Sequence, residues 1–196
     1  VKGIKWIRWL YGYPEEITDD LLEIMNEEKI CPYFDLPFQH ASATVVKKMG
    51  RSITAGDALR LIEKIRNRVK GAVIRTSLIV GFPGEGLKEF SELKQFVREA
   101  RFEHLGVFTY SPEPGTKAFY LEETVCPAEK EARRQELMAI QKEISRNFYR
   151  TFKGQTLEVL LEDQEREQAE KGVLYGRARF QAPEVDGQVI VKDKKR

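Results

Sequence analysis

The feature that most constrains the fold is a ten-residue apolar run, residues 71–80 (GAVIRTSLIV), with helix-like patterns on both sides. Ahead of it, Leu59, Ile62 and Ile65 recur at the spacing of one helical face, and residues 87–100 repeat that spacing behind it. A mostly apolar strand is typical of parallel sheets, whose two faces are both covered by other elements. The run therefore predicts a β/α architecture.

The strand-then-helix order runs through residues 1–150 and indicates successive β/α units around a parallel sheet. Further strands are expected at residues 4–10, 31–36 and 105–110. Helices are expected after the capping residues Thr18 and Thr54, around residues 45–49, and from Pro127 to about Arg150, the last with a buried stripe of Ile140, Ile144 and Phe148. Such units form closed barrels or open sheets, and the pattern alone leaves both alternatives open.

The pattern changes after residue 150, so we divide the chain into residues 1–150 and residues 151–196. Short strand patterns at residues 157–161, 173–178 and 189–191 predict the start of a small β-barrel. The acidic stretch 162–170 is expected to be a solvated hairpin turn. Because the strand set stops before a barrel closes, we expect unpaired strand edges there.

Composition excludes several classes of protein. The chain carries 33 Lys and Arg against 31 Asp and Glu, and a net charge of +2 indicates neither nucleic acid nor membrane binding by bulk electrostatics. No apolar run approaches the ~20 residues of a membrane span. Cys31 and Cys126 lie too far apart for a metal motif and are expected to be reduced thiols. Because Val1 is not an initiator methionine, we expect a fragment of a longer protein.

Three polar clusters lie where predicted strands end, which is where β/α proteins gather functional groups. The first contains Asp35, Gln39, His40 and Ser42, a set that suits a ribose, an amine or a carboxylate. His40 is a candidate general base or a hydrogen-bonding positioner. The alternative is turn chemistry, with Ser42 as the cap of the next helix.

The other two clusters are weaker signals by themselves. In residues 81–85 (GFPGE), two glycines allow close backbone approach to a ligand, but taken alone a plain strand-to-helix turn is the favoured interpretation. In residues 109–116 (TYSPEPGT), Tyr110 is able to stack on a base, but an ordinary Pro/Gly loop is the simpler interpretation.

Isolated residues add further candidates. Arg51 and Arg75 are candidate carboxylate clamps, and Arg75 inside an apolar strand indicates that one strand face opens to something polar. The alternative for both is a surface salt bridge. Trp6 and Trp9 are expected to serve packing, and His104 is expected to be solvated or to cap an element.

Taken together, these segments resemble the radical S-adenosylmethionine (SAM) methylthiotransferases in order and spacing. The resemblance is carried by residues 33–42 with the following Met-Gly-Arg, 75–85 and 107–116, with support from residues 6–14. Residues 152–191 resemble the TRAM module of the same family. The form Asp-Leu-Pro-x-Gln-His at residues 35–40 resembles the RimO branch, whereas the tRNA-modifying branch has His-Leu-Pro-x-Gln-Ser.

The resemblance implies a partial (β/α)6 barrel, to which this chain contributes the third to sixth strands, followed by a TRAM-like module. It implies SAM as cofactor and two 4Fe-4S clusters in the full-length protein. The residues it places near SAM are Gln39, His40, Ser42, Arg51, Arg75, Ile79, Val80, Gly81, Phe82 and Tyr110. The family's CxxxCxxC motif is absent from this chain, so we expect no cluster ligand in it and no activity from it alone.

The implied activity is transfer of a methylthio group to an aspartate of the ribosomal small-subunit protein S-twelve, in the cytoplasm, with the TRAM-like module docking the substrate or the ribosome. Three alternatives stay open. The first is a tRNA substrate for the same chemistry, which a basic and aromatic TRAM face would favour. The second is a non-catalytic module that binds RNA or the ribosome. The third is an unrelated barrel enzyme with His40 as its base.

Overall fold

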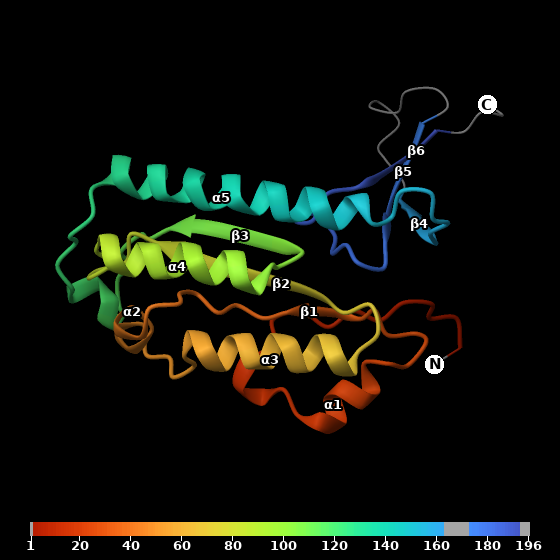
Figure 1. The fold of residues 1–196 in the computed structure, drawn as a ribbon, viewed down its shortest axis with the longest axis horizontal. Helices are drawn as coiled ribbons and strands as arrows, with labels where there is room; N and C mark the ends of the chain where they lie inside the picture. Colours follow the sequence, from red (N-terminus) through yellow and green to blue (C-terminus); the bar gives the residue numbers. More distant parts are fainter. Residues whose placement is uncertain (1, 163–172, 193–196) are drawn as a thin grey trace.

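The computed structural model describes residues 2–162 and 173–192. Its first half is a three-stranded parallel sheet in the order β1 (Tyr33–Asp35), β2 (Val73–Val80), β3 (His104–Thr109). In register, Asp35 pairs with Arg75 and Arg75 pairs with His104. Helices α3 (Ala55–Arg68), α4 (Leu87–Ala100) and α5 (Pro127–Arg150) lie along one side of this sheet (Figure 1). The predicted β/α architecture is confirmed.

Side chains of β2 alternate between two environments. Ile74, Leu78 and Val80 have no exposed surface and belong to the main hydrophobic core under the helices. Arg75 and Ile79 point to the opposite side and stay partly exposed. Successive strand residues face opposite sides of a sheet, so one side of this sheet is less covered than its apolar sequence suggests. We call this side the open face.

Helices α1 (Asp19–Ile24), α2 (Ala43–Lys48) and α3 begin where the sequence predicts. The Thr18 side chain accepts a hydrogen bond from Leu21 at the start of α1. Thr54 and Asp57 form a reciprocal capping box at the start of α3. Each cap satisfies backbone N–H groups that the first helical turn leaves unpaired. The predicted helix near residues 45–49 is α2.

Helix α5 has its predicted bounds, and its predicted stripe of Ile140, Ile144 and Phe148 packs against the hydrophobic clusters. The buried positions are Lys130, Arg133, Leu137 and Gln141, whereas Ile140 and its apolar neighbours are only partly buried. The polar side chains at these buried positions form hydrogen bonds with neighbouring segments. Gln141 Nε2, for example, donates to the carbonyl of residue 102 at 2.7 Å. Hydrophobic periodicity does not detect a stripe of this composition.

The N-terminal segment departs from the prediction. Residues 4–10 form only an isolated parallel bridge between Ile7 and Ile30. The amide of Ile7 donates to the Lys29 carbonyl, and the Ile7 carbonyl accepts from the Cys31 amide, both at 2.8 Å. Among residues 4–10, only Ile7 forms backbone hydrogen bonds with another segment in the described part of the chain. The hydrogen-bond ladder of a strand therefore does not form.

The second half is a three-stranded antiparallel sheet, β4 (Val159–Glu162), β5 (Val173–Ala178) and β6 (Val189–Lys192). It follows α5 and lies beyond the amino ends of the parallel strands (Figure 1). The predicted hairpin turn at residues 162–170 lies almost wholly outside the described residues. In the described part, no helix is long and apolar enough to cross a membrane.

Replacing Leu137 on α5 by alanine should destabilise the protein by about 2–5 kcal/mol, because this fully buried side chain joins α5 to the core. The free energy of unfolding measured by denaturant titration would show the loss. Leu87→Ala on α4 is the control, since Leu87 is 79% exposed. Equal losses in the two variants would contradict the assigned packing of α5.

Candidate functional site

The carboxyl end of β1 continues into residues that stay attached to β2. The amide of Gln39 donates to the Ser77 carbonyl at 2.9 Å, and its carbonyl accepts from the Ile79 amide at 2.8 Å. Gln39 adopts a left-handed backbone, with φ of 69°, which a non-glycine residue rarely occupies. Strained backbone of this kind clusters at binding sites. The loop after β1 is therefore fixed against the edge where ligands would meet the sheet.

His40 is fully enclosed and has a defined tautomer. Its Nδ1 accepts a hydrogen bond from the Ser42 amide at 3.0 Å, so the proton lies on Nε2, which donates to Glu85 Oε2 at 2.9 Å. Ser42 occupies the N-cap position of α2, yet its side chain makes no capping bond. The His40 side chain has no exposed surface. The structure therefore gives His40 a positioning contact with Glu85.

Glu85 connects three separate parts of the chain. Its Oε1 accepts from the Gly81 amide at 3.0 Å and from Arg133 Nη1 of α5 at 2.6 Å, while Oε2 accepts from His40. Arg133 also donates to the Glu85 backbone carbonyl at 2.9 Å. A buried carboxylate is stable only when such partners replace its water. Glu85 thereby fixes the loops after β1 and β2 relative to α5.

These contacts determine how Glu85 titrates. Burial raises the pKa of its carboxyl, but hydrogen bonds from His40, Arg133 and Gly81 act in the opposite direction and are stronger together. The resulting pKa lies below the usual value of a glutamate. The carboxylate therefore stays charged across the neutral pH range.

The turn at Gly81 is closed on one side by α5. Gly81 has φ of 74°, and a Cβ at this position would lie 2.2 Å from Cγ of Lys130. Lys130 Nζ then reaches the Tyr110 carbonyl at 3.1 Å and pairs with Glu123. Position 81 must be glycine because the Lys130 side chain packs against it. This packing explains the glycine without a bound ligand.

Phe82 and Tyr110 form an aromatic pair between the second and third loops. Their ring centroids lie 5.0 Å apart in an edge-to-face arrangement, and Phe82 is buried. The Tyr110 hydroxyl donates to the Ala118 carbonyl at 3.0 Å, and Lys130 Nζ lies 5.1 Å from its ring centre. Tyr110 therefore joins two loops and keeps one partly exposed ring.

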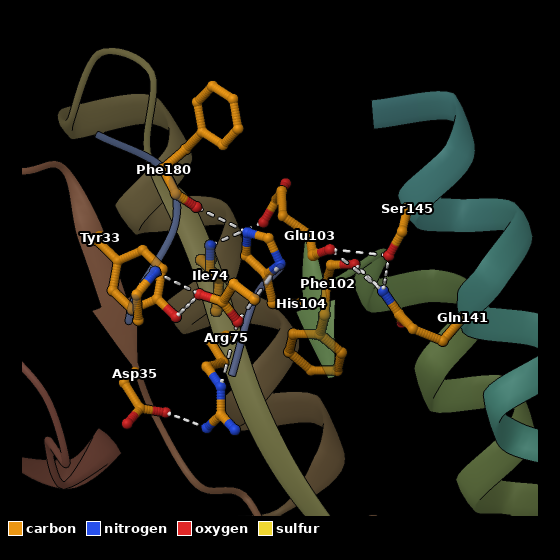
Figure 2. Close-up of polar contacts among 12 residues, drawn as sticks. Tyr33, Asp35, Ile74, Arg75, Phe102, Glu103, His104, Gln141, Ser145 and Phe180 are labelled. Carbon is orange, nitrogen blue, oxygen red and sulfur yellow. Dashed lines mark hydrogen bonds and ion pairs between the residues drawn. The ribbon is translucent and has the colours of Figure 1, made fainter. Parts of the chain in front are cut away.

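The remaining predicted site residues lie in different surroundings. Val80 faces the core with no exposed surface, whereas Ile79 faces the open face. Arg51 lies 5.9 Å from the ring centre of Tyr13. Arg75 Nη1 donates to Asp35 Oδ1 at 3.0 Å (Figure 2). Contact of any of these residues with SAM stays a prediction.

The open face has the chemistry to hold a nucleoside. Phe108 of β3 is 55% exposed and lies across from Ile79 in register, so together they offer aromatic and apolar surface to a flat ring. Ser77, which lies on the same side of β2 as Ile79, offers a hydroxyl suited to a sugar. This combination of apolar surface and a hydrogen-bonding hydroxyl suits the adenosyl part of SAM.

The described residues do not fit an iron–sulfur cluster. Residues 2–162 and 173–192 contain no group of three His, Cys, Asp or Glu side chains able to hold a metal ion. Cys31 is buried, Cys126 is exposed, and both are free, as the sequence predicted.

Sequence reasoning missed two features of this region. The first is the role of Glu85, Arg133 and Lys130 as a connected polar network, because partners from distant segments leave no local pattern. The second is Phe108, whose exposure follows from its place on a strand with one open side. His104, expected to be solvated or capping, is instead buried, with Nε2 donating to the Phe180 carbonyl at 2.7 Å (Figure 2).

Comparison with protein families matches both halves of the chain. Residues 7–97 match the Radical SAM superfamily model, and residues 154–196 match the TRAM domain model. The protein named ribosomal protein uS12 methylthiotransferase RimO of Aquifex aeolicus is 51% identical over 193 residues, covering 98% of this chain and 44% of that protein. The chain is therefore similar to the RimO methylthiotransferases over nearly its whole length, and residues 7–97 are similar to the radical SAM superfamily.

Further relatives agree. The RimO protein of Caldanaerobacter subterraneus subsp. tengcongensis is 46% identical over 197 residues, which is 100% of this chain and 44% of that protein. The chain thus spans less than half the length of the curated relatives it matches. Coproporphyrinogen III oxidase (HemN) from Escherichia coli, a radical SAM enzyme, has a similar fold, with a TM-score of 0.60, 21% identity, and coverage of 71% of this chain and 32% of that one. The predicted fold, a partial radical SAM barrel followed by a TRAM-like module, is confirmed.

Glu85→Gln should destabilise the protein by about 3–5 kcal/mol at neutral pH, because it removes the charge that faces buried Arg133. Since the pKa of Glu85 is lowered in the folded state, its contribution is complete above the unfolded value of about 4.3 and is lost as pH falls below it. The difference in unfolding free energy between wild type and variant should shrink in that acid range. Glu63→Gln on the exposed side of α3 is the control, and a pH-independent difference would contradict the assignment.

Gly81→Ala should destabilise the protein more than Gly115→Ala. Both glycines have positive φ, but a Cβ at position 115 meets nothing within 4 Å, whereas one at position 81 meets Lys130. The excess loss of unfolding free energy, about 1–3 kcal/mol, reports the collision. Adding Lys130→Ala should remove this excess in a double-mutant cycle. Additive losses would show that Lys130 does not lie over Gly81.

Proposed function

We propose that this chain is part of an enzyme that uses SAM and iron–sulfur chemistry to transfer a methylthio group to an aspartate of ribosomal protein uS12. The observation that carries the proposal is 51% identity to a RimO protein over 98% of the chain, together with an open sheet face suited to a nucleoside. Because ribosomal proteins are the proposed substrate, we infer a cytoplasmic location.

In this proposal the open face is one wall of the SAM site. Phe108 and Ile79 would hold the adenine, and Gln39 and Ser77 would hold the ribose. When bound, SAM would supply radical chemistry for the transfer. The network around Glu85 positions the loops that border this wall, and His40 acts through that network as a positioning residue.

The remaining parts of the proposal concern the whole protein. Two 4Fe-4S clusters would be bound by segments of the longer protein that this chain does not match. We place the boundary between the barrel part and the TRAM-like module after Arg150, where α5 ends. The module would dock the protein substrate or the ribosome.

A tRNA substrate is the second candidate, because TRAM modules are suited to RNA when they carry a basic face. Residues 151–196 contain equal numbers of basic and acidic side chains. This balance favours a protein substrate over a polyanion.

The test is to incubate the complete, cluster-loaded protein with SAM, a reductant and either purified uS12 or unmodified tRNA. We expect one methylthio group on uS12, detected by mass spectrometry of its peptides, and none on tRNA. Modification of tRNA alone would replace the proposed substrate, and modification of neither would overturn the proposal.

Phe108→Ala should weaken SAM binding by about tenfold, since it removes one stacking surface worth about 1–3 kcal/mol. Equilibrium titration of the cluster-loaded protein with SAM measures this effect. Leu87→Ala, on the exposed surface of α4, should leave the affinity unchanged. Wild-type affinity in Phe108→Ala would remove this residue from the proposed adenine wall.

A further inference from the structure

A buried carboxylate of the C-terminal module, Asp186, lies among the amino ends of the parallel strands. The Tyr33 hydroxyl of β1 donates to its Oδ2, and the Ala182 amide donates to the same oxygen at 2.7 Å. Its other oxygen, Oδ1, lies 3.5 Å from Arg75 Nε and 3.5 Å from His104 Nδ1. Asp186 thus contacts all three parallel strands.

The neighbourhood of Asp186 is firmly attached to the barrel part. Arg179 Nη2 donates to the carbonyls of Glu28 and Ile30 at 2.6 and 2.7 Å. Arg8 Nη2 returns a hydrogen bond to the Arg179 carbonyl at 2.9 Å. Residues 179–186 therefore cover the amino ends of the parallel strands, which we call the floor of the half-barrel. They belong to the segment that matches the TRAM domain.

Arg75, rather than His104, is the partner of Asp186 Oδ1. Since His104 Nε2 donates its proton to the Phe180 carbonyl, neutral His104 turns an unprotonated Nδ1 toward the carboxylate. Burial lowers the pKa of His104 despite the nearby Asp186, so the ring is neutral at pH 7. Two acceptors do not bond each other, which leaves Arg75 as the donor that faces Oδ1.

The guanidinium of Arg75 is held through Nη1 and Nε. Nη1 donates to Asp35 Oδ1, and Nε faces Asp186 (Figure 2). Asp35 is itself fixed, because its Oδ2 accepts from the Tyr11 amide at 3.2 Å. Nη2 makes no hydrogen bond to residues 2–162 or 173–192. This group lies beside Gly106, where a Cβ would approach it to 3.5 Å.

Arg75 also lies between two cavities. One, of about 580 Å³, is lined by Arg75, Gly106 and Tyr149 among others. The other, of about 230 Å³, lies on the side of Tyr11 and Asp35. Arg75, together with Val185 of the C-terminal segment, borders both. A volume of several hundred Å³ is enough to hold part of a ligand or a peptide segment.

We propose that Arg75 Nη2 is a binding group for a backbone carbonyl of the polypeptide substrate, and that Asp186 positions it from the C-terminal module. This inference rests on the proposed function and adds a substrate contact to it. Two carboxylates already neutralise the single positive charge of Arg75, so a neutral carbonyl suits Nη2 better than the carboxylate of SAM. Arginine offers rigid, directional N–H groups for such a contact.

The substitution Asp186→Asn separates positioning from anchoring. The amide oxygen is able to keep both bonds made at Oδ2, to Tyr33 and Ala182. The amide nitrogen then takes the place of Oδ1, where it donates to His104 Nδ1 and no longer attracts Arg75. Tyr33→Phe has the opposite effect, because it removes an anchoring bond and leaves the Arg75 pair intact.

The experiment uses the complete cluster-loaded protein and three readouts: affinity for uS12 measured without SAM, affinity for SAM, and kcat and KM for uS12. Asp186→Asn and Arg75→Lys should each weaken uS12 binding and lower kcat/KM by about 10-fold to 100-fold through KM, because misplacing a positioning group by about 1 Å has effects of this size. SAM affinity should stay at the wild-type value. Tyr33→Phe and Leu87→Ala, the latter on the exposed surface of α4 outside both cavities, should bind uS12 normally.

Other outcomes would overturn the inference. A tenfold loss of SAM affinity in Arg75→Lys would place Arg75 on the carboxylate of SAM. Equal loss of uS12 binding in Asp186→Asn and Tyr33→Phe would reduce Asp186 to a structural anchor. If the wild-type protein modifies tRNA and does not bind uS12, the proposed function itself is wrong, and this inference is overturned with it. Unchanged uS12 binding in both Arg75→Lys and Asp186→Asn, with a wild type that does modify uS12, refutes this inference alone.

Discussion

A single buried carboxylate, that of Glu85, holds the carboxyl end of the sheet together. It accepts hydrogen bonds from the loop after β1, from the turn after β2 and from the last helix of the barrel part. Because a charge in this position is stable only with every partner in place, the three segments take up one arrangement. The Gly81 amide is one of these partners, so the turn after β2 is held in the same arrangement.

A second carboxylate, that of Asp186, has the corresponding role at the amino end of the strands. It comes from the C-terminal module and contacts Tyr33 and Arg75, so the floor of the half-barrel contains residues that lie far away in sequence. The open face extends between these two anchored ends. Its exposed aromatic surface at Phe108 and its guanidinium at Arg75 lie on the same side of the sheet, where they are able to act on one bound complex.

The sequence predicted the elements well where the local signal is strong. The strand at residues 71–80 and the capping box at Thr54 were both found, since apolar runs and caps depend on neighbouring residues alone. It was wrong for residues 4–10, because a strand needs partners that lie elsewhere in the chain. It also missed the buried polar positions of α5, because Arg133 and Gln141 are buried only through contacts with distant segments.

The sequence by itself determined the order of β/α units, the caps, and the family motifs at residues 33–42, 75–85 and 107–116. Only the tertiary structure decided which motif residues lie on the open face of the sheet. His40 and Val80 belong to conspicuous motifs, yet one is enclosed by Glu85 and the other is buried in the core. The sequence did not single out Phe108 or Asp186. Phe108 lies on the open face, and Asp186 lies at the amino ends of the parallel strands. The physical reason is that exposure and charge pairing depend on contacts between segments far apart in the chain.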